Sequence, residues 1–146
     1  MICTVDASVF VAASREQEQQ FDASFECLQR ARARGVTVVC PSLVLPECAA
    51  AVARATGMAE EADEILELIE TFPRLQLIPV SLSLARQAAQ IGKSHRLRGG
   101  DSVYVAVAEA FDATLLTWDT EMLERAPAVV STMTPADWLA RQPATP

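Results

Sequence analysis

The sequence predicts an α/β fold in which helices cover both faces of a five-stranded parallel sheet. Five short apolar runs, rich in β-branched residues, alternate with segments of helical periodicity. Such strand–helix–strand units build a parallel sheet, because the crossover helix returns the chain to the end of the sheet where the next strand begins. The chain has 146 residues, the usual size of one domain. We therefore expect one domain over residues 1–141 and a frayed tail over residues 142–146.

Each expected strand is an apolar run bounded by polar or turn residues. A strand that is covered on both faces needs few polar side chains, which fits runs of this kind. The expected strands are residues 2–5, 36–40, 76–80, 114–117 and 129–132.

Helical patterns fill the gaps between the first three strands. Phe21, Phe25 and Leu28 recur at helical spacing within a polar stretch. Ser42 can cap the next helix, with Pro46 in its first turn, where the missing N–H does no harm. The expected helices of this half are residues 8–13, part of 16–34, 42–55 and 59–72.

The second half continues the alternation. Either Ser81 or Ser83 can cap a helix that runs through Ile91, and a nearly all-apolar helix follows a loop over residues 96–100. Pro135 occupies the favoured first position of the last helix. The expected helices of this half are residues 81–91, 102–111, 120–125 and 134–141.

The cysteines and the first residues indicate a cytoplasmic protein. The cysteines show no paired spacing, and only His95 could add a nitrogen ligand, so we expect free buried thiols rather than a zinc site. No basic leader precedes Asp6, so we expect neither a signal peptide nor a membrane span.

Four acidic residues are expected at one edge of the sheet. Asp6 ends the first strand, Glu47 follows the second, and Asp119 follows the fourth, while Asp101 opens the helix that leads into the fourth. Ligands of open α/β sheets bind at the carboxyl ends of the strands. Carboxylates that converge there repel one another unless a cation neutralises them, and ligation by oxygen alone selects Mg²⁺ or Mn²⁺. The pattern predicts a metal site and phosphoryl-transfer chemistry.

Each acid also has a purely structural interpretation. Asp101 and Asp119 can be helix caps, and Glu47 can be a first-turn residue that is favourable for the helix dipole. An acid that ends a buried strand, as Asp6 does, has few such uses. The four together favour the site over four separate caps.

The order of these motifs resembles the PIN-domain ribonucleases, in particular the VapC-type toxins of toxin–antitoxin pairs. The matching stretches are the first strand into D-A-S, P-S-x-x-x-P-E, R-L-R-G-G-D and L-L-T-W-D, over roughly residues 1–140. The resemblance implies a PIN-like three-layer α/β/α fold with strand order 3-2-1-4-5. It assigns the four acidic places to Asp6, Glu47, Asp101 and Asp119, and gives Ser8 and Thr117 the role of supporting the pocket.

The resemblance also implies an activity and partners. A Mg²⁺- or Mn²⁺-dependent endoribonuclease is expected, which cleaves RNA, such as tRNA, and is often a homodimer. A cognate antitoxin is expected to cover the pocket. One or two ions would hold the scissile phosphate and activate a water, so that no protein base is required. An arginine-bearing antitoxin segment would suit an acidic pocket.

Net charge is the main objection to an RNA partner. The chain carries 12 basic and 19 acidic residues, a net charge of −7, whereas nucleic-acid binders usually show a basic excess. Metal ions would offset the four acids of the pocket, so local basic groups matter more. Lys93, His95, Arg96 and Arg98 are expected in one loop before Asp101, where they could contact RNA phosphates. A solvated loop is the alternative, and the arginines at positions 30, 32 and 34 are a weaker candidate.

Other α/β families fit the residues less well. A receiver domain needs an acidic pair after the first strand and a lysine near the last, and a haloacid-dehalogenase-like phosphatase needs an aspartate where Ser8 stands. No G-x-G-x-x-G turn follows the first strand, which excludes the usual dinucleotide site. Two alternatives stay open, a non-catalytic PIN-like module that binds RNA or protein, and a free-standing RNA-processing nuclease without an antitoxin.

Overall fold

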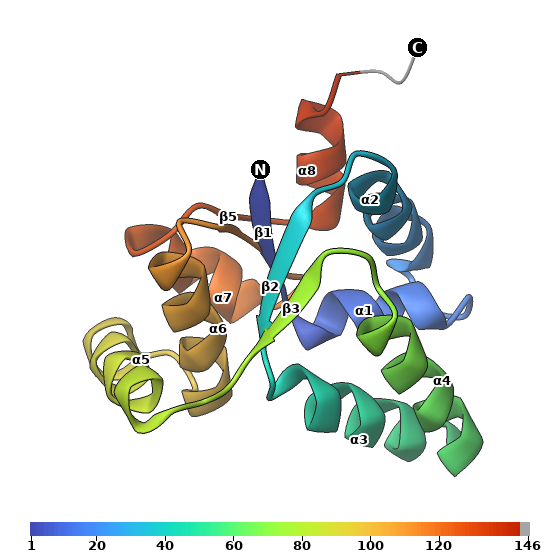
Figure 1. The fold of residues 1–146 in the computed structure, drawn as a ribbon, viewed down its shortest axis with the longest axis horizontal. Coiled ribbons are helices and arrows are strands. Elements are labelled where there is room, and N and C mark those ends of the chain that lie inside the picture. The colour runs from blue at the N-terminus through green and yellow to red at the C-terminus, as the bar shows by residue number, and fades with distance from the viewer. Residues whose placement is uncertain (144–146) are drawn as a thin grey trace.

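The five strands of the protein form one parallel sheet, in the order β3-β2-β1-β4-β5. This is a computed structural model, and it describes residues 1–143 (Figure 1). Each strand pair is parallel, with Cys3 of β1 opposite Val38 of β2 on one side and Thr114 of β4 on the other. The strands are β1 (Ile2–Val5), β2 (Thr37–Pro41), β3 (Leu75–Ile78), β4 (Thr114–Leu116) and β5 (Thr132–Met133). The predicted α/β class and strand order are confirmed.

Helices lie on both sides of the sheet. Figure 1 shows α5 and α6 on one side and α1, α3 and α4 on the other, with α8 beside α2 near the N-terminus. The helices are α1 (Ala7–Ser14), α2 (Phe21–Ala33), α3 (Val44–Thr56), α4 (Ala59–Glu70), α5 (Leu82–His95), α6 (Gly99–Ala110), α7 (Thr120–Arg125), the 3₁₀ turn η1 (Ala126–Ala128) and α8 (Pro135–Arg141). Among the described residues, none of these helices is long and apolar enough to cross a membrane.

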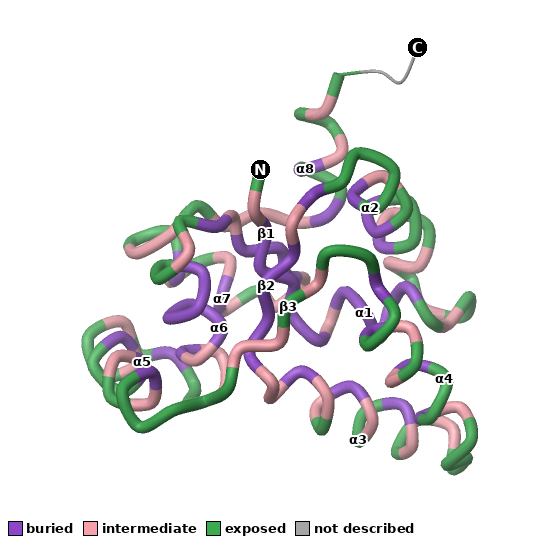
Figure 2. The backbone as a smooth tube through the Cα atoms, viewed as in Figure 1, coloured by how far each residue is buried: buried purple, intermediate pink, exposed green. Residues whose placement is uncertain are grey.

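The core lies between the central strands and the helices that cover them. Figure 2 shows β1, β2 and the inner half of α6 as buried segments. Helix α6 is buried along most of its length because its residues 104–108 are all fully covered. The four cysteines are free and buried, as predicted, and burial raises the pKa of the Cys3 thiol to about 11.

Two helix starts differ from the predictions. Helix α3 begins at Val44 and has no side-chain cap, because the Ser42 N–H donates to the Ile78 carbonyl and so continues the pairing with β3. Helix α6 begins at Gly99, since the Ser102 N–H already donates to the Arg98 carbonyl at 2.9 Å. The predicted loop over residues 96–100 is therefore shorter, and Asp101 lies inside the first helical turn.

Other boundaries also differ. Helix α5 is capped by Ser81, one of the two predicted residues, but runs to His95 instead of Ile91. The fifth strand was expected at residues 129–132 and is Thr132–Met133 instead, because the Val129 and Val130 N–H groups both donate to the Ala126 carbonyl. Phe25, one of the three apolar residues at helical spacing in α2, is 46% exposed.

The C-terminal end was expected to fray from residue 142. Arg34 donates a hydrogen bond to the Gln142 side chain at 3.1 Å, so this residue contacts the end of α2. Residues 144–146 of the expected tail lie outside the described residues.

Candidate metal centre

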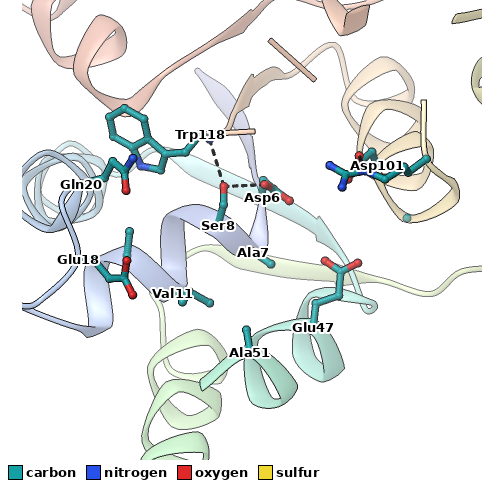
Figure 3. A pocket seen from close by; sticks show the side chains of 13 residues that line it. Asp6, Ala7, Ser8, Val11, Glu18, Gln20, Glu47, Ala51, Asp101 and Trp118 are labelled. Atoms are coloured by element: carbon teal, nitrogen blue, oxygen red, sulfur yellow. Dashed lines mark hydrogen bonds and ion pairs between the residues drawn. The ribbon is translucent and has the colours of Figure 1, made fainter. Parts of the chain in front are cut away.

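A cavity of about 590 Å³ opens at the carboxyl ends of the central strands. Three of the four predicted acids line it from three different elements: Asp6 after β1, Glu47 in α3 and Asp101 in α6 (Figure 3). Asp119 is not among its lining residues, and its carboxylate is linked to the site through Arg98. Three of the four acids therefore meet at one edge of the sheet, and Asp119 lies beside the cavity.

Asp6 is the buried carboxylate of the site. It lies between β1 and α1 and is 5% exposed. Its Oδ2 accepts hydrogen bonds from Ser8 Oγ at 2.7 Å and from Thr117 Oγ1 at 2.9 Å. Burial raises the pKa of Asp6, and the two hydroxyl donors offset only part of this rise. No basic side chain bonds to this carboxylate in the described chain, so it is a place where a cation would be stabilised.

The same two hydroxyls tie the loop after β4 to β1. Ser8 Oγ accepts from the Trp118 N–H at 3.1 Å, and Thr117 Oγ1 accepts from the Asp119 N–H at 3.0 Å. Each hydroxyl thus donates to Asp6 and accepts from a backbone amide of the neighbouring segment. Ser8 and Thr117 therefore hold the Asp6 carboxylate in place, and their support of a metal pocket stays a prediction.

Glu47 reaches the cavity from the first turn of α3. Its Oε2 accepts a hydrogen bond from the hydroxyl of Tyr104 at 2.9 Å. Partial burial raises the pKa of Glu47, and the nearby carboxylates of Asp6 and Asp101 raise it further, while the Tyr104 bond opposes the rise. A Cβ atom at Gly100 would lie 2.9 Å from Glu47 Oε1, so the glycine leaves room for this carboxylate.

Asp101 and Asp119 are held by one arginine. Arg98 Nε donates to Asp101 Oδ2 at 3.0 Å, and Arg98 Nη2 donates to Asp119 Oδ2. Burial raises the pKa of Asp101, although the Arg98 charge opposes the shift. Asp119 also caps α7, since its Oδ1 accepts from the Met122 N–H at 2.9 Å. The cap interpretation is thus correct for Asp119, whereas Arg98, not Asp101, is the N-cap residue of α6.

The predicted RNA-binding group does not form one loop. Lys93 and His95 belong to the last turn of α5, and Arg96 is the residue that ends this helix in a left-handed conformation with φ of 56°. None of these three lines the cavity, and His95 borders a separate hollow between α5 and α6. Of the four, only Arg98 reaches the site, and RNA contact by the others stays a prediction.

Sequence reasoning missed several residues that line the cavity or bond to its acids. Tyr104 lies three residues after Asp101, a spacing that puts both on one face of α6 and could have revealed it. Trp118 lines the cavity and donates from its indole to Ser24 of α2 at 2.7 Å. Glu18 and Gln20, in the segment between α1 and α2, line the outer rim, and no pattern in the sequence marks them (Figure 3).

The donor chemistry fits a hard divalent cation. Within residues 1–143, no three His, Cys, Asp or Glu side chains lie close enough to hold one ion among them. Mg²⁺ does not require such a cage, because it keeps several waters and is commonly held by one or two carboxylates together with substrate phosphate. The buried Asp6, with Glu47 and Asp101 around the same cavity, provides oxygen ligands of this kind.

Solved structures share this fold at low sequence identity. A chain of VapBC2 from Rickettsia felis, bound to a promoter DNA fragment, matches with TM-score 0.70 and 19% identity over 92% of this chain and 98% of its own. FitAcB from Neisseria gonorrhoeae matches with TM-score 0.68 and 22% identity over 92% and 98%. VapC20 from Mycobacterium tuberculosis, a sarcin-ricin loop cleaving toxin, matches with TM-score 0.69 and 19% identity over 85% and 94%.

Sequence comparison identifies the family. No curated protein matches the chain. The PIN-domain profile matches residues 3–128, which include β1 through η1 and all four predicted acids. With the parallel sheet and the acidic cavity at its strand ends, this match shows that the chain belongs to the PIN-domain family.

Proposed function

We propose that this protein is a Mg²⁺- or Mn²⁺-dependent endoribonuclease and the toxin of a toxin–antitoxin pair. The observation that carries the proposal is the buried carboxylate of Asp6, at a cavity shared with Glu47 and Asp101. Two hydroxyls donate to this carboxylate, and no basic side chain of residues 1–143 bonds to it. A structural role alone does not explain such a group, because burying a carboxylate without a cation costs free energy.

In this proposal the acids ligate the metal ion, and hydroxyl groups keep the acids in position. One or two of the carboxylates of Asp6, Glu47 and Asp101 would ligate the ion directly, and waters would complete its coordination. Asp119 would become available once its carboxylate turns from Arg98. The ion would lower the pKa of a water and offset the charge that develops on the phosphate. Ser8 and Thr117 keep Asp6 in place, and the Tyr104 hydroxyl keeps Glu47 in the cavity. No histidine lines the cavity, which agrees with chemistry that needs no protein base.

The toxin role and the partners rest on the neighbours and the charge of the site. The similar chains come from VapBC2, FitAcB and VapC20 structures, of which the last is described as cleaving the sarcin-ricin loop. By analogy we propose RNA as the substrate, with tRNA as one candidate. We also propose that an antitoxin covers the cavity with a basic segment, and that the protein is a cytoplasmic homodimer. The acidic lining suits a basic plug.

Cleavage of end-labelled RNA tests the activity. Purified protein, freed of any partner, is incubated with total RNA or tRNA in Mg²⁺ or Mn²⁺, with EDTA, and as the Asp6→Asn variant. Asp22→Asn, which removes an exposed carboxylate on α2, is the matched control. Activity that needs the ion and Asp6, but not Asp22, supports the nuclease.

Two other outcomes point to the alternatives. Absence of cleavage, together with no rise in melting temperature on adding Mn²⁺, would favour the non-catalytic binding module. Metal-dependent cleavage without toxicity on expression, and without a small neighbouring reading frame, would favour a free-standing processing nuclease.

A further inference from the structure

Arg98 carries a positive charge into the acidic cavity. We propose that Arg98 is a built-in counter-ion, which bridges Asp101 and Asp119 while no metal is bound and is displaced from them when a divalent cation binds. The inference rests on the proposed metal site. It adds a residue of this chain that competes with the metal for the same carboxylates.

The bridge joins two separate elements of the chain. Arg98 precedes α6 and is bonded both to Asp101 of that helix and to Asp119, 21 residues away at the start of α7. A pair with Asp101 alone would be an ordinary contact at i,i+3 on a helix. The second bond makes Arg98 a link between two acids that come from different elements, and it is the sole basic residue lining the cavity in the described chain.

The bridge is easy to release. The Arg98 side chain is 63% exposed, and exposed ion pairs contribute little because water screens them. The Arg98 carbonyl accepts from the Ser102 N–H and from Ser102 Oγ, both at 2.9 Å. These two bonds to the Arg98 carbonyl fix the start of α6 without the guanidinium, so the Arg98 side chain can leave while Asp101 stays in position.

A divalent cation is the stronger partner for these acids. Asp101 is mostly covered, with a side chain 18% exposed, and it lines the cavity together with the buried Asp6. An ion with two charges can contact both carboxylates at short range, whereas the Arg98 fork bonds to Asp101 and Asp119 and not to Asp6. Metal binding is therefore expected to displace the guanidinium from Asp101.

Mn²⁺ binding by calorimetry tests the competition. The proteins are the metal-free wild type, Arg98→Gln, Arg98→Lys, and Arg30→Gln as control, because Arg30 also pairs with a carboxylate, Glu26, but lies away from the cavity. Loss of two exposed ion pairs should tighten Mn²⁺ binding by Arg98→Gln about three- to tenfold, with Arg30→Gln unchanged within about twofold. Arg98→Lys keeps the charge without the fork and should fall between wild type and Arg98→Gln.

Two further readouts report on the metal-free state. Metal-free Arg98→Gln should melt below wild type, because Asp101 and Asp119 lose their counter-charge, and saturating Mn²⁺ should close the gap. In the wild type, the Arg98 Nε–H signal in a ¹H–¹⁵N spectrum, identified by its loss in Arg98→Gln, should shift on titration with Mg²⁺.

The outcomes separate this inference from the proposed function. If Mn²⁺ binds the wild type in an Asp6-dependent way, but Arg98→Gln binds it equally or more weakly, the counter-ion role is wrong and the metal site stands. If neither the wild type nor any Arg98 variant binds Mn²⁺, both proposals are wrong.

Discussion

Replacing Thr117 by valine tests whether the hydroxyls under Asp6 hold the site together. The change keeps the shape of the side chain and removes one hydroxyl that is fully buried. That hydroxyl donates to Asp6 at 2.9 Å and accepts from the Asp119 N–H at 3.0 Å. A bond to a charged acceptor contributes about 1.5–3 kcal/mol and an orphaned N–H adds about 1 kcal/mol, so Thr117→Val should lower the free energy of unfolding by about 2–4 kcal/mol.

Thr4→Val is the matched control on the neighbouring strand. Thr4 is as fully buried as Thr117, but its Oγ1 is the one buried side-chain oxygen or nitrogen in the described chain without a hydrogen-bond partner. Removing an unpaired buried hydroxyl should be neutral or should stabilise the protein by up to about 1 kcal/mol. The two substitutions are chemically identical, so their difference isolates the bonding of Thr117.

Urea denaturation of the metal-free proteins measures both changes. At this chain length, 1 kcal/mol corresponds to about 2–4 °C in melting temperature, so in a parallel thermal melt Thr117→Val should unfold about 4–16 °C below wild type. Equal stability of the two variants, or a larger loss in Thr4→Val than in Thr117→Val, would refute the reasoning.

Three other predictions concern the support of Glu47, the charge of Asp6 and the thiols. Tyr104→Phe removes the hydroxyl bonded to Glu47 at 2.9 Å and should weaken Mn²⁺ binding roughly tenfold by calorimetry; unchanged affinity would show that Tyr104 does not position Glu47. Burial raises the pKa of Asp6 above its value in the unfolded chain. As the pH rises past the unfolded pKa, the folded protein therefore loses free energy of unfolding, by about 1.4 kcal/mol for each unit by which the pKa is raised. Metal-free Asp6→Asn should therefore unfold at higher urea than wild type at pH 8, and the difference should vanish as the pH falls below both pKa values; a less stable variant at pH 8 contradicts this. Burial raises the pKa of Cys27 and of Cys40 to about 12, so the four free cysteines should react with a thiol reagent at pH 8 only after unfolding, and rapid labelling of the native protein would count against it.

A strand was predictable where the residues of an apolar run are also the ones that pair with a neighbouring strand. The first four strands lie within a residue or two of their predicted bounds, because each is a short apolar segment between polar or turn residues. The fifth failed because its valines, Val129 and Val130, bond to the Ala126 carbonyl in a turn, and only Thr132 and Met133 pair with β4. Local apolar character does not reveal which backbone partner an N–H will find. The strand order came from the family resemblance, not from the periodicity.

Helix α5 shows how packing overrides a local stop signal. The predicted end at Ile91 lies just before Gly92, a residue type that often follows the end of a helix, yet the helix continues to His95. A Cβ atom at Gly92 would lie 2.6 Å from Ser102 Oγ, so this glycine allows close contact between α5 and α6 instead of ending the helix. A sequence pattern cannot distinguish these two uses of glycine without the neighbouring helix.

The candidate site was predictable to the extent that strand ends determine it. Asp6 and Glu47 follow adjacent strands, so their convergence follows from a parallel sheet. The side-chain partners were not predictable, because they depend on rotamers and on contacts between distant segments. Tyr104 with Glu47, 57 residues apart, and Arg98 with Asp119 are both of this kind.

The segment R-L-R-G-G-D combines four distinct contributions to the site. Leu97 anchors it in the core, being 8% exposed, and Arg98 supplies the positive charge. Neither Gly99 nor Gly100 has a positive φ, so no turn requires them; a Cβ atom at Gly99 would meet nothing within 4 Å, whereas one at Gly100 would lie 2.9 Å from Glu47 Oε1. Of the two, only the second glycine leaves space that Glu47 occupies in the cavity. Because Asp101 follows directly, the segment brings a carboxylate, its counter-charge and room for Glu47 to the same edge of the cavity.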